Sequence, residues 1–287
     1  MNPCVVLPWI VFLTASLFHQ QPPQKNPADI NETICREKFT LADSLALRNK
    51  PIQEVVAAMA RSFIGTPYGA NMIDRPGREQ LIVNMQKLDC VTFYENALVL
   101  ARCIKKNRLT FDDYKKELQF VRYRGGIIDG YTSRLHYTSD YFFDNEKKSI
   151  WKNVTKALGG IPWNKKINFM SAHTDLYWQL KTSPENIKKI QMVEEEMNRR
   201  TTFYIPKANV QKISSMIKDG DIIGITTAID GLDCSHTGIA LWQNGILHLL
   251  HAPMPGLNVQ ITALPLQGYL SKIKKDTGIM VVRPVEP

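Results

Sequence analysis

Apolar side chains recur at helical spacing in three stretches of the chain. The first covers residues 39–64, and Asn49-Lys50-Pro51 divides it into two helices, because the residue before a proline disfavours the helical conformation. The second covers residues 91–104 and follows Asp89, a good N-cap residue. The third covers residues 184–200, where a proline in the first turn favours a helix start.

The last third of the chain changes to the pattern of β-strands. Apolar runs predict strands at residues 222–226, 236–242, 245–252 and 279–282, and Asn244-Gly245 is a strong signal for a tight hairpin turn. Helices come first and hairpin-linked strands last. This order predicts the α+β class, with an antiparallel sheet.

The N-terminus carries a short apolar run. Residues 5–18 are almost wholly apolar, and no charged residue occurs before Lys25. A run of this length is too short for an ordinary membrane span, which needs about 20 residues, and it fits a secretory signal peptide. We therefore predict a signal peptide over residues 1–20, a mature domain over residues 21–287, and export to the periplasm. The alternatives are a buried N-terminal element and an uncleaved anchor.

Composition and charge narrow the class of protein. Of 287 residues, 44% are hydrophobic and 22% are charged, which is typical of globular proteins and excludes a disordered or collagen-like chain. Lys and Arg number 36 against 27 Asp and Glu, so the net charge is +9, which favours either an anionic partner or merely solubility. The basic residues are spread out, and export opposes nucleic-acid binding, so we expect no nucleic-acid partner.

Cys90 is a candidate nucleophile. It directly follows the predicted cap at a helix start, where the helix dipole favours anions and lowers the pKa of thiols. The cysteines left after leader removal have spacings that fit neither a disulfide framework nor a zinc site. The alternative is a buried cysteine that only packs. We interpret Cys234, which lies on a strand, as a packing or substrate-contact residue.

Two histidines on neighbouring strands are candidates for the base that a nucleophilic cysteine needs. His236 begins one strand of the predicted hairpin and His251 ends the other. Adjacent strands lie about 4.8 Å apart, so two imidazoles on one face can form a hydrogen bond. His248 lies three residues from His251, so the period of two places it on the other face. Taken singly, each histidine could be structural.

The ordered set of motifs resembles the NlpC-type papain-like cysteine peptidases, which cut bacterial cell-wall peptides. Within that superfamily the sequence is most similar to the N-acetylmuramoyl-L-alanine amidase-like family, over roughly residues 52–282. The motifs are Gly65-Thr66-Pro67-Tyr68, Asp89-Cys90-Val91-Thr92-Phe93-Tyr94-Glu95, Arg122-Tyr123-Arg124-Gly125-Gly126, Ser133-Arg134-Leu135-His136-Tyr137-Thr138-Ser139-Asp140, Gly220-Asp221-Ile222, Ser235-His236-Thr237-Gly238-Ile239 and His251-Ala252-Pro253.

This resemblance implies a papain-like NlpC-type core and a role for each catalytic residue. Cys90 would be the nucleophile, His236 the general base and acid, and His251 the residue that orients His236. Asp89 would cap the cysteine helix and shape the site, and Tyr68 would face Cys90 near the oxyanion or substrate. Ser235 would contact substrate beside His236. The resemblance implies no metal and no other cofactor.

We interpret the middle region, about residues 105–218, as a large basic insertion that can fold over the active-site cleft. Its segment 134–145 is dense in polar and aromatic residues, and we expect Arg134, His136, Tyr137 and Asp140 to bind substrate. The alternative is a loop that packs on the core through Tyr137 and its aromatic neighbours.

These features predict an exported cysteine hydrolase of peptidoglycan fragments. The resemblance implies cleavage of the amide between L-alanine and N-acetylmuramic acid, or its 1,6-anhydro form. One alternative is a D-glutamyl stem-peptide endopeptidase of the same superfamily. Another is a non-catalytic wall-binding module, which the presence of Cys90 and His236 argues against. We expect a peptidoglycan or muropeptide substrate, a monomer, and no stable membrane insertion after leader removal.

Overall fold

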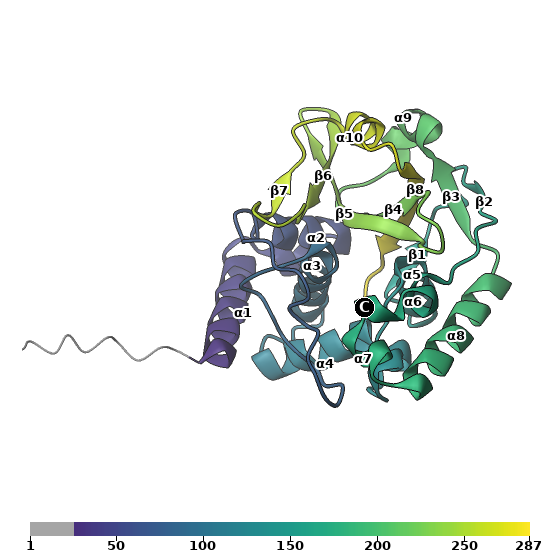
Figure 1. The fold of residues 1–287 in the computed structure, drawn as a ribbon. Coiled ribbons are helices and arrows are strands. Elements are labelled where there is room, and N and C mark those ends of the chain that lie inside the picture. The colour runs from purple at the N-terminus through teal and green to yellow at the C-terminus, as the bar shows by residue number, and fades with distance from the viewer. Residues whose placement is uncertain (1–25) are drawn as a thin grey trace, which may run out of the picture.

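The computed structural model describes residues 26–287, so the predicted signal peptide lies outside the described residues. The N-terminal half is helical, and α3 lies against its three neighbours (Figure 1). These helices are α1 (Pro27–Ser44), α2 (Ile52–Arg61), α3 (Cys90–Lys105) and α4 (Phe111–Arg122). The predicted division at Asn49-Lys50-Pro51 is confirmed, because α1 ends before it and α2 begins directly after Pro51.

The strands form one antiparallel sheet in the order β2-β3-β8-β4-β5-β6-β7, and β1 also pairs with β8. The strands are β1 (Trp151–Asn153), β2 (Ile161–Pro162), β3 (Phe203–Pro206), β4 (Ile222–Thr227), β5 (Cys234–Gln243), β6 (Ile246–His251), β7 (Gln260–Ile261) and β8 (Asp276–Pro284). Asn244 and Gly245 both have positive φ and join β5 to β6, as the sequence predicts. The predicted α+β class with an antiparallel sheet is therefore confirmed.

The two faces of the sheet are covered by different helices. On one face Ile222, Ile239 and Val282 belong to the core that α2 and α3 complete. On the other face Ile223 and Ile279 pack with residues of α9 (Val210–Ile213) and α10 (Leu266–Lys272). Figure 1 shows this layering, with α2 and α3 below the strands and α9 and α10 above them.

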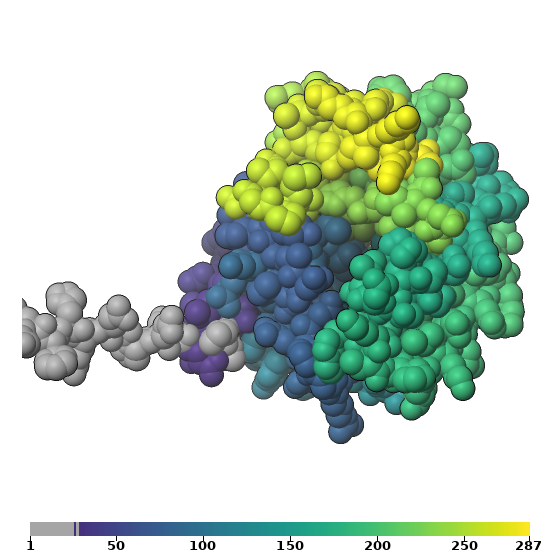
Figure 2. Space-filling view, in the orientation of Figure 1, coloured from purple at the N-terminus to yellow at the C-terminus, as the bar shows by residue number. Residues whose placement is uncertain are grey.

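The middle region is interwoven with the rest of the fold. Its strands β1 and β3 both pair with β8, and its helix α4 packs on α3. The segment 134–145, treated as a loop in the sequence, contains the helix α5 (Thr138–Lys147). In Figure 2 the surfaces of the N-terminal helices, the middle region and the C-terminal part meet one another.

The remaining elements are short, apart from one long helix. That helix is α8 (Pro184–Arg199), which confirms the third predicted helix. The others are α6 (Phe169–Ala172), α7 (Trp178–Lys181), η1 (Leu47–Asn49), η2 (Arg124–Gly126), η3 (Tyr131–Ser133), η4 (Thr174–Leu176), η5 (Lys207–Asn209) and η6 (Ser214–Met216). Every helix between residues 26 and 287 is too short or too polar to cross a membrane.

A glycine joins the helical part to the sheet. Gly220 precedes β4 with a φ of +81°, and a side chain there would collide with the backbone carbonyl of Gln53 in α2. Its neighbour Asp221 is fully buried and forms an ion pair with Arg283 of β8 at 2.7 Å. This close approach holds the central strands against α2.

Candidate active site

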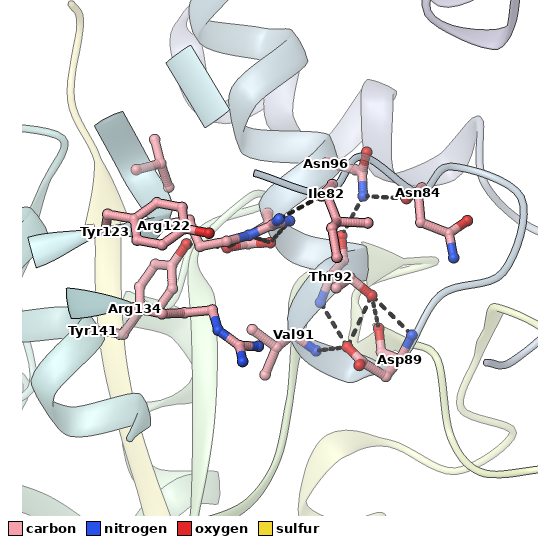
Figure 3. A network of polar contacts seen from close by, with 12 residues as sticks. Ile82, Asn84, Asp89, Val91, Thr92, Asn96, Arg122, Tyr123, Arg134 and Tyr141 are labelled. Carbon is pink, nitrogen blue, oxygen red and sulfur yellow. Dashed lines mark hydrogen bonds and ion pairs between the residues drawn. The ribbon is translucent and has the colours of Figure 1, made fainter. Parts of the chain in front are cut away.

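Cys90 is the first residue of α3, and the turn before it is built around Asp89. The Asp89 carboxylate accepts hydrogen bonds from the backbone N–H groups of Val91 at 3.0 Å and Thr92 at 2.8 Å, and Thr92 Oγ1 accepts one from the Asp89 N–H at 2.9 Å (Figure 3). This reciprocal arrangement is a capping box. The predicted N-cap role of Asp89 is confirmed.

The electrostatics of the Cys90 thiol differ from the expectation for a helix start. Burial and the nearby Asp89 carboxylate raise the pKa of Cys90 to about 11, although hydrogen bonds with Thr237 act in the opposite direction. The expected lowering is therefore wrong, because the helix dipole contributes only about 0.3–1 kcal/mol and burial outweighs it. At neutral pH the thiol is protonated, so its chemistry requires a base.

Two histidine rings meet at the end of the β5–β6 hairpin. His236 Nε2 lies 2.7 Å from His251 Nδ1, and the ring planes are nearly perpendicular. The buried His251 ring also packs edge-to-face on Tyr269 of α10, with 5.3 Å between ring centroids. His248 instead binds the backbone carbonyl of Thr262 at 2.8 Å. The predicted hairpin register, with His251 and not His248 beside His236, is confirmed.

Both rings of this pair are neutral at physiological pH. Burial and then the neighbouring His251 lower the pKa of His236 to about 3, and burial lowers that of His251 to about 4. Because Nε2 of His236 is used in the contact with His251, Nδ1 is its remaining nitrogen. A neutral ring that donates from Nε2 keeps Nδ1 free to accept a proton.

Thr237 connects the histidine strand to the cysteine helix. Its hydroxyl donates to the Cys90 carbonyl at 2.9 Å, and it directly follows His236 in β5. Two phenols also lie near the thiol, since charge on Cys90 contributes to raising the pKa values of Tyr68 and Tyr269, after burial. Tyr68 and Tyr269 thus lie near Cys90, and Tyr269 also packs on His251 of the histidine pair.

Two charged residues of segment 134–145, Arg134 and Asp140, are paired with charged partners inside the protein. The buried Arg134 is in ion pairs with Asp74 at 2.5 Å and Glu79 at 3.2 Å. Asp140, 1% exposed, accepts from Arg124 at 2.6 Å and from Arg200 at 2.7 Å. These contacts favour the packing alternative over the expected substrate contact for Arg134 and Asp140, because their charged groups are already paired.

The two other residues expected in this segment are also engaged internally. The buried Tyr137 donates its hydroxyl hydrogen to Glu194 at 2.6 Å. The His136 ring lies against Tyr131 with the two ring planes tilted by 45°, and its Nε2 lies 3.0 Å from the Tyr131 carbonyl oxygen. Ser235 differs, because its side chain is exposed while its hydroxyl donates to Asp276 at 3.0 Å. Ser235 is exposed and Tyr68 is half-buried, so both keep accessible surface.

Comparison with protein-family models decides the family. The model described as N-acetylmuramoyl-L-alanine amidase-like matches residues 58–279. The chain belongs to this family. The matched region includes Cys90, both histidines of the hydrogen-bonded pair, and the middle region between them.

Solved structures agree with this amidase-like assignment. An N-acetylmuramoyl-L-alanine amidase from Bacteroides uniformis ATCC 8492 shares 35% identity, with a TM-score of 0.78 over 82% of this chain and 99% of that one. A protein from Bacteroides fragilis, solved under the provisional name of a xylanase, shares 38% identity, with a TM-score of 0.74 over 79% and 99% of the two chains. Protein LPG0564 from Legionella pneumophila, at 21% identity, a TM-score of 0.69 and 91% and 97% coverage, shows the same fold. No match is found among curated proteins.

Motif residues of this amidase-like chain also support α3 from within the core. Arg122 is almost fully buried and contacts the carboxylate of Glu95 in α3 at 2.6 Å, while its Nη1 donates to the Ile82 carbonyl at 2.6 Å. Tyr141 donates to the same carboxylate at 2.6 Å. Figure 3 shows this network beside the capped start of α3. The network positions the helix that presents Cys90.

Sequence reasoning missed three residues around the histidine pair. Thr237 carries the contact to Cys90, Tyr269 packs on His251, and Asp276 accepts from Ser235. Side chains alternate along β5, so Thr237 lies on the same face as Ile239, which packs in the core with α3. This alternation was a signal in the sequence that Thr237 faces α3. Tyr269 and Asp276 come from the distant α10 and β8, and no local pattern indicates them.

The part of the chain that the structure describes has no group of three or more His, Cys, Asp or Glu side chains arranged to hold a metal ion.

Proposed function

We propose that this protein is an exported cysteine hydrolase with a papain-like, NlpC-type active site. The bond cut is the amide between L-alanine and N-acetylmuramic acid, or its 1,6-anhydro form. The observation that carries the proposal is the hydrogen-bonded pair of His236 and His251, joined through Thr237 to Cys90 at the start of α3. A nucleophile, a base and a residue that orients the base are the parts that thiol acyl transfer requires.

In the proposed reaction, His236 Nδ1 accepts the thiol proton while Cys90 Sγ attacks the lactyl carbonyl carbon. The backbone N–H of Cys90 stabilises the oxyanion that forms. The protonated His236 then donates its proton to the leaving nitrogen of L-alanine, and the C–N bond breaks to leave a thioester on Cys90. Water attacks the thioester carbonyl and gives one proton to His236. The C–S bond then breaks, His236 returns that proton to the Cys90 sulfur, and the muramic acid leaves with the new carboxyl group.

The protonation states of the resting site suit this order of events. The thiol is protonated and His236 is neutral, because burial raises the pKa of the first and lowers that of the second. We therefore expect proton transfer to accompany the attack on bound substrate, not to precede it. In this proposal His236 donates from Nε2 to His251 Nδ1, the two atoms that lie 2.7 Å apart, which leaves His236 Nδ1 as the nitrogen that accepts the thiol proton.

Incubation with defined muropeptides tests the reaction. A muramoyl-peptide and the matching sugar-free peptide are each treated with the protein and with Cys90→Ala, and the products are read by mass spectrometry. Release of the intact L-alanyl stem peptide from the first substrate alone supports the amidase. Release of L-Ala-D-Glu from the sugar-free peptide would instead support the endopeptidase, and xylan in a third arm tests the activity named for one structural relative.

Export to the periplasm is a separate part of the proposal. It rests on the apolar run of residues 5–18, ahead of the first charged residue at Lys25. Cell fractionation followed by N-terminal sequencing should find a mature chain that begins near residue 21 in the periplasm. A full-length chain in the cytoplasm would contradict export while leaving the proposed chemistry standing.

A further inference from the structure

A bulge in β5 turns two consecutive side chains to the face away from α3. The pairing of β5 with β4 shifts between Cys234 and His236, so Ser235 is the extra residue. Strict alternation would put residues three apart on opposite faces. Yet Cys234 belongs to the core that α3 completes, and Thr237 contacts Cys90 at the start of α3. Ser235 and His236, which lie between them, therefore share the other face of the strand.

The Ser235 hydroxyl meets a buried carboxylate on that face. It donates to Oδ1 of Asp276, in β8, at 3.0 Å, although β4 lies between the two strands in the sheet. Asp276 is 3% exposed, and its other oxygen, Oδ2, is buried without a hydrogen-bond partner. Within residues 26–287, Ser235 is therefore the one hydrogen-bond donor to this carboxylate.

This contact decides how the Ser235 hydroxyl can bind a ligand. A serine hydroxyl has one proton to donate and two lone pairs that accept. Turning the proton away would leave the buried Asp276 carboxylate without a donor, which costs more free energy than an ordinary hydrogen bond contributes. Because Ser235 is exposed, its oxygen presents lone pairs, and no proton, to a ligand. The site therefore selects a ligand group that donates a hydrogen bond.

Tyr269 relates this acceptor to the catalytic residues. Its ring packs on His251, the hydrogen-bonded partner of His236, with 5.3 Å between ring centroids. Burial, followed by charge on Asp276 and on Cys90, raises the pKa of Tyr269 to about 12, so its phenol lies near both groups. The carboxylate, the histidine pair and the thiol thus all lie beside one phenol.

We infer that Ser235 Oγ accepts a hydrogen bond from the N–H of the scissile amide, and that Asp276 is the positioning residue that fixes this acceptor. The inference rests on the proposed function. In that reaction His236 gives its proton to the leaving nitrogen, so the N–H on this nitrogen is the substrate donor nearest to the residue that adjoins Ser235. Holding the N–H keeps the lone pair of the nitrogen free to receive the proton as the C–N bond breaks.

Two substrates that differ at this one group test the inference. They are muramoyl-L-alanine and its ester analogue, in which L-lactate replaces L-alanine and an oxygen stands in place of the N–H. We expect Ser235→Ala to lower kcat/KM for the amide about fivefold and to leave kcat/KM for the ester unchanged, since one hydrogen bond is lost with the amide alone. An equal loss with both substrates would show a structural role and overturn the inference.

Variants of Asp276 test whether this residue acts through Ser235. Asp276→Leu removes the acceptor and should lower the ratio of amide to ester kcat/KM, whereas Asp276→Asn keeps an acceptor oxygen and should restore the ratio. In Ser235→Ala/Asp276→Leu the ratio should fall no further than in Ser235→Ala. The matched control is Ser271→Ala on α10, an exposed serine that donates to a backbone carbonyl and should leave the ratio unchanged. A further fall in the double variant would contradict the positioning role.

Binding without turnover separates failure of this inference from failure of the proposed function. Calorimetry compares the amide and the ester on Cys90→Ala and on Cys90→Ala/Ser235→Ala, so the weaker carbonyl acceptor of the ester cancels in the comparison. A preference for the amide that falls about fivefold without Ser235 supports the acceptor, even if the wild type cuts no muramoyl substrate. A preference that is equal or absent in both proteins overturns the acceptor, even if the wild type is an active amidase.

Discussion

The contact between His236 and His251 leads to a quantitative prediction. If His251 only orients His236 by accepting from Nε2, a substitution that keeps an acceptor should retain activity and one that removes it should not. His251→Asn keeps an acceptor oxygen, whereas His251→Leu fills the buried site beside Tyr269 without one. The two variants differ chiefly in this hydrogen bond.

The size of the effect follows from that bond. A hydrogen bond contributes about 0.5–1.5 kcal/mol net, so its loss should lower kcat roughly 2–13-fold in His251→Leu relative to His251→Asn. Removal of the base in His236→Ala should cost about 10²–10⁴-fold. His248→Ala should be nearly silent in catalysis, because its ring binds a backbone carbonyl away from the pair.

The assay is steady-state turnover of a muramoyl-peptide at pH 7, with circular dichroism to verify that each variant is folded. Equal kcat values for His251→Leu and wild type would refute an orienting role. A loss in folded His251→Leu as large as that in His236→Ala would show that His251 takes part in proton transfer itself. A sensitive His248 would contradict the contact seen in the structure.

Four further predictions concern the nucleophile, the core and pH. Cys90→Ala should abolish turnover, whereas Cys234→Ala should retain most of it. Alkylation at pH 7, read by mass spectrometry, should modify Cys90 first, because the other described cysteines are buried. Arg122→Ala should lower the free energy of unfolding in urea by about 3–5 kcal/mol, since it leaves a buried carboxylate unpaired; a loss below about 1 kcal/mol would refute this. Arg134→Ala should also destabilise the protein, and normal stability with weakened turnover would restore its expected substrate role. Burial lowers the pKa of His236 to about 3, below the unfolded value of about 6.5, so the unfolded chain binds more protons and stability is lost as pH falls from about 6.5 toward 3. Urea titrations should show a loss of roughly 2 kcal/mol for this ring at pH 5, and a stability that does not change between pH 7 and pH 5 would contradict its burial in the neutral form.

Local signals in the sequence predicted the parts of the site that local structure builds. Asp89 is recognisable as a cap because its carboxylate serves N–H groups two and three residues ahead. The Asn244-Gly245 turn sets the hairpin register, and that register decides which histidine meets His236. Each of these inferences depends only on residues that are close in sequence, within one helical turn or one hairpin.

The segment 134–145 was harder to interpret because its partners are distant in sequence. Arg134 pairs with Asp74, 60 residues earlier, and Asp140 pairs with Arg200, 60 residues later. A dense set of polar and aromatic residues looks the same in sequence whether it faces substrate or neutralises buried charge. The raised pKa of Cys90 has a similar origin, since burial depends on the whole fold and not on the helix start alone.

The motifs that identify the family therefore combine two kinds of residue. Asp89 and Glu95 stand in one motif, yet Asp89 caps the helix beside the thiol while Glu95 is buried against Arg122. Both residues position Cys90 through α3: Asp89 at the start of the helix, and Glu95 on the helix face that is buried in the core. A substitution at either position would impair turnover, so activity alone does not separate them. Stability does, because the cap is worth about 0.5–2 kcal/mol and an orphaned buried charge costs about 3–5 kcal/mol.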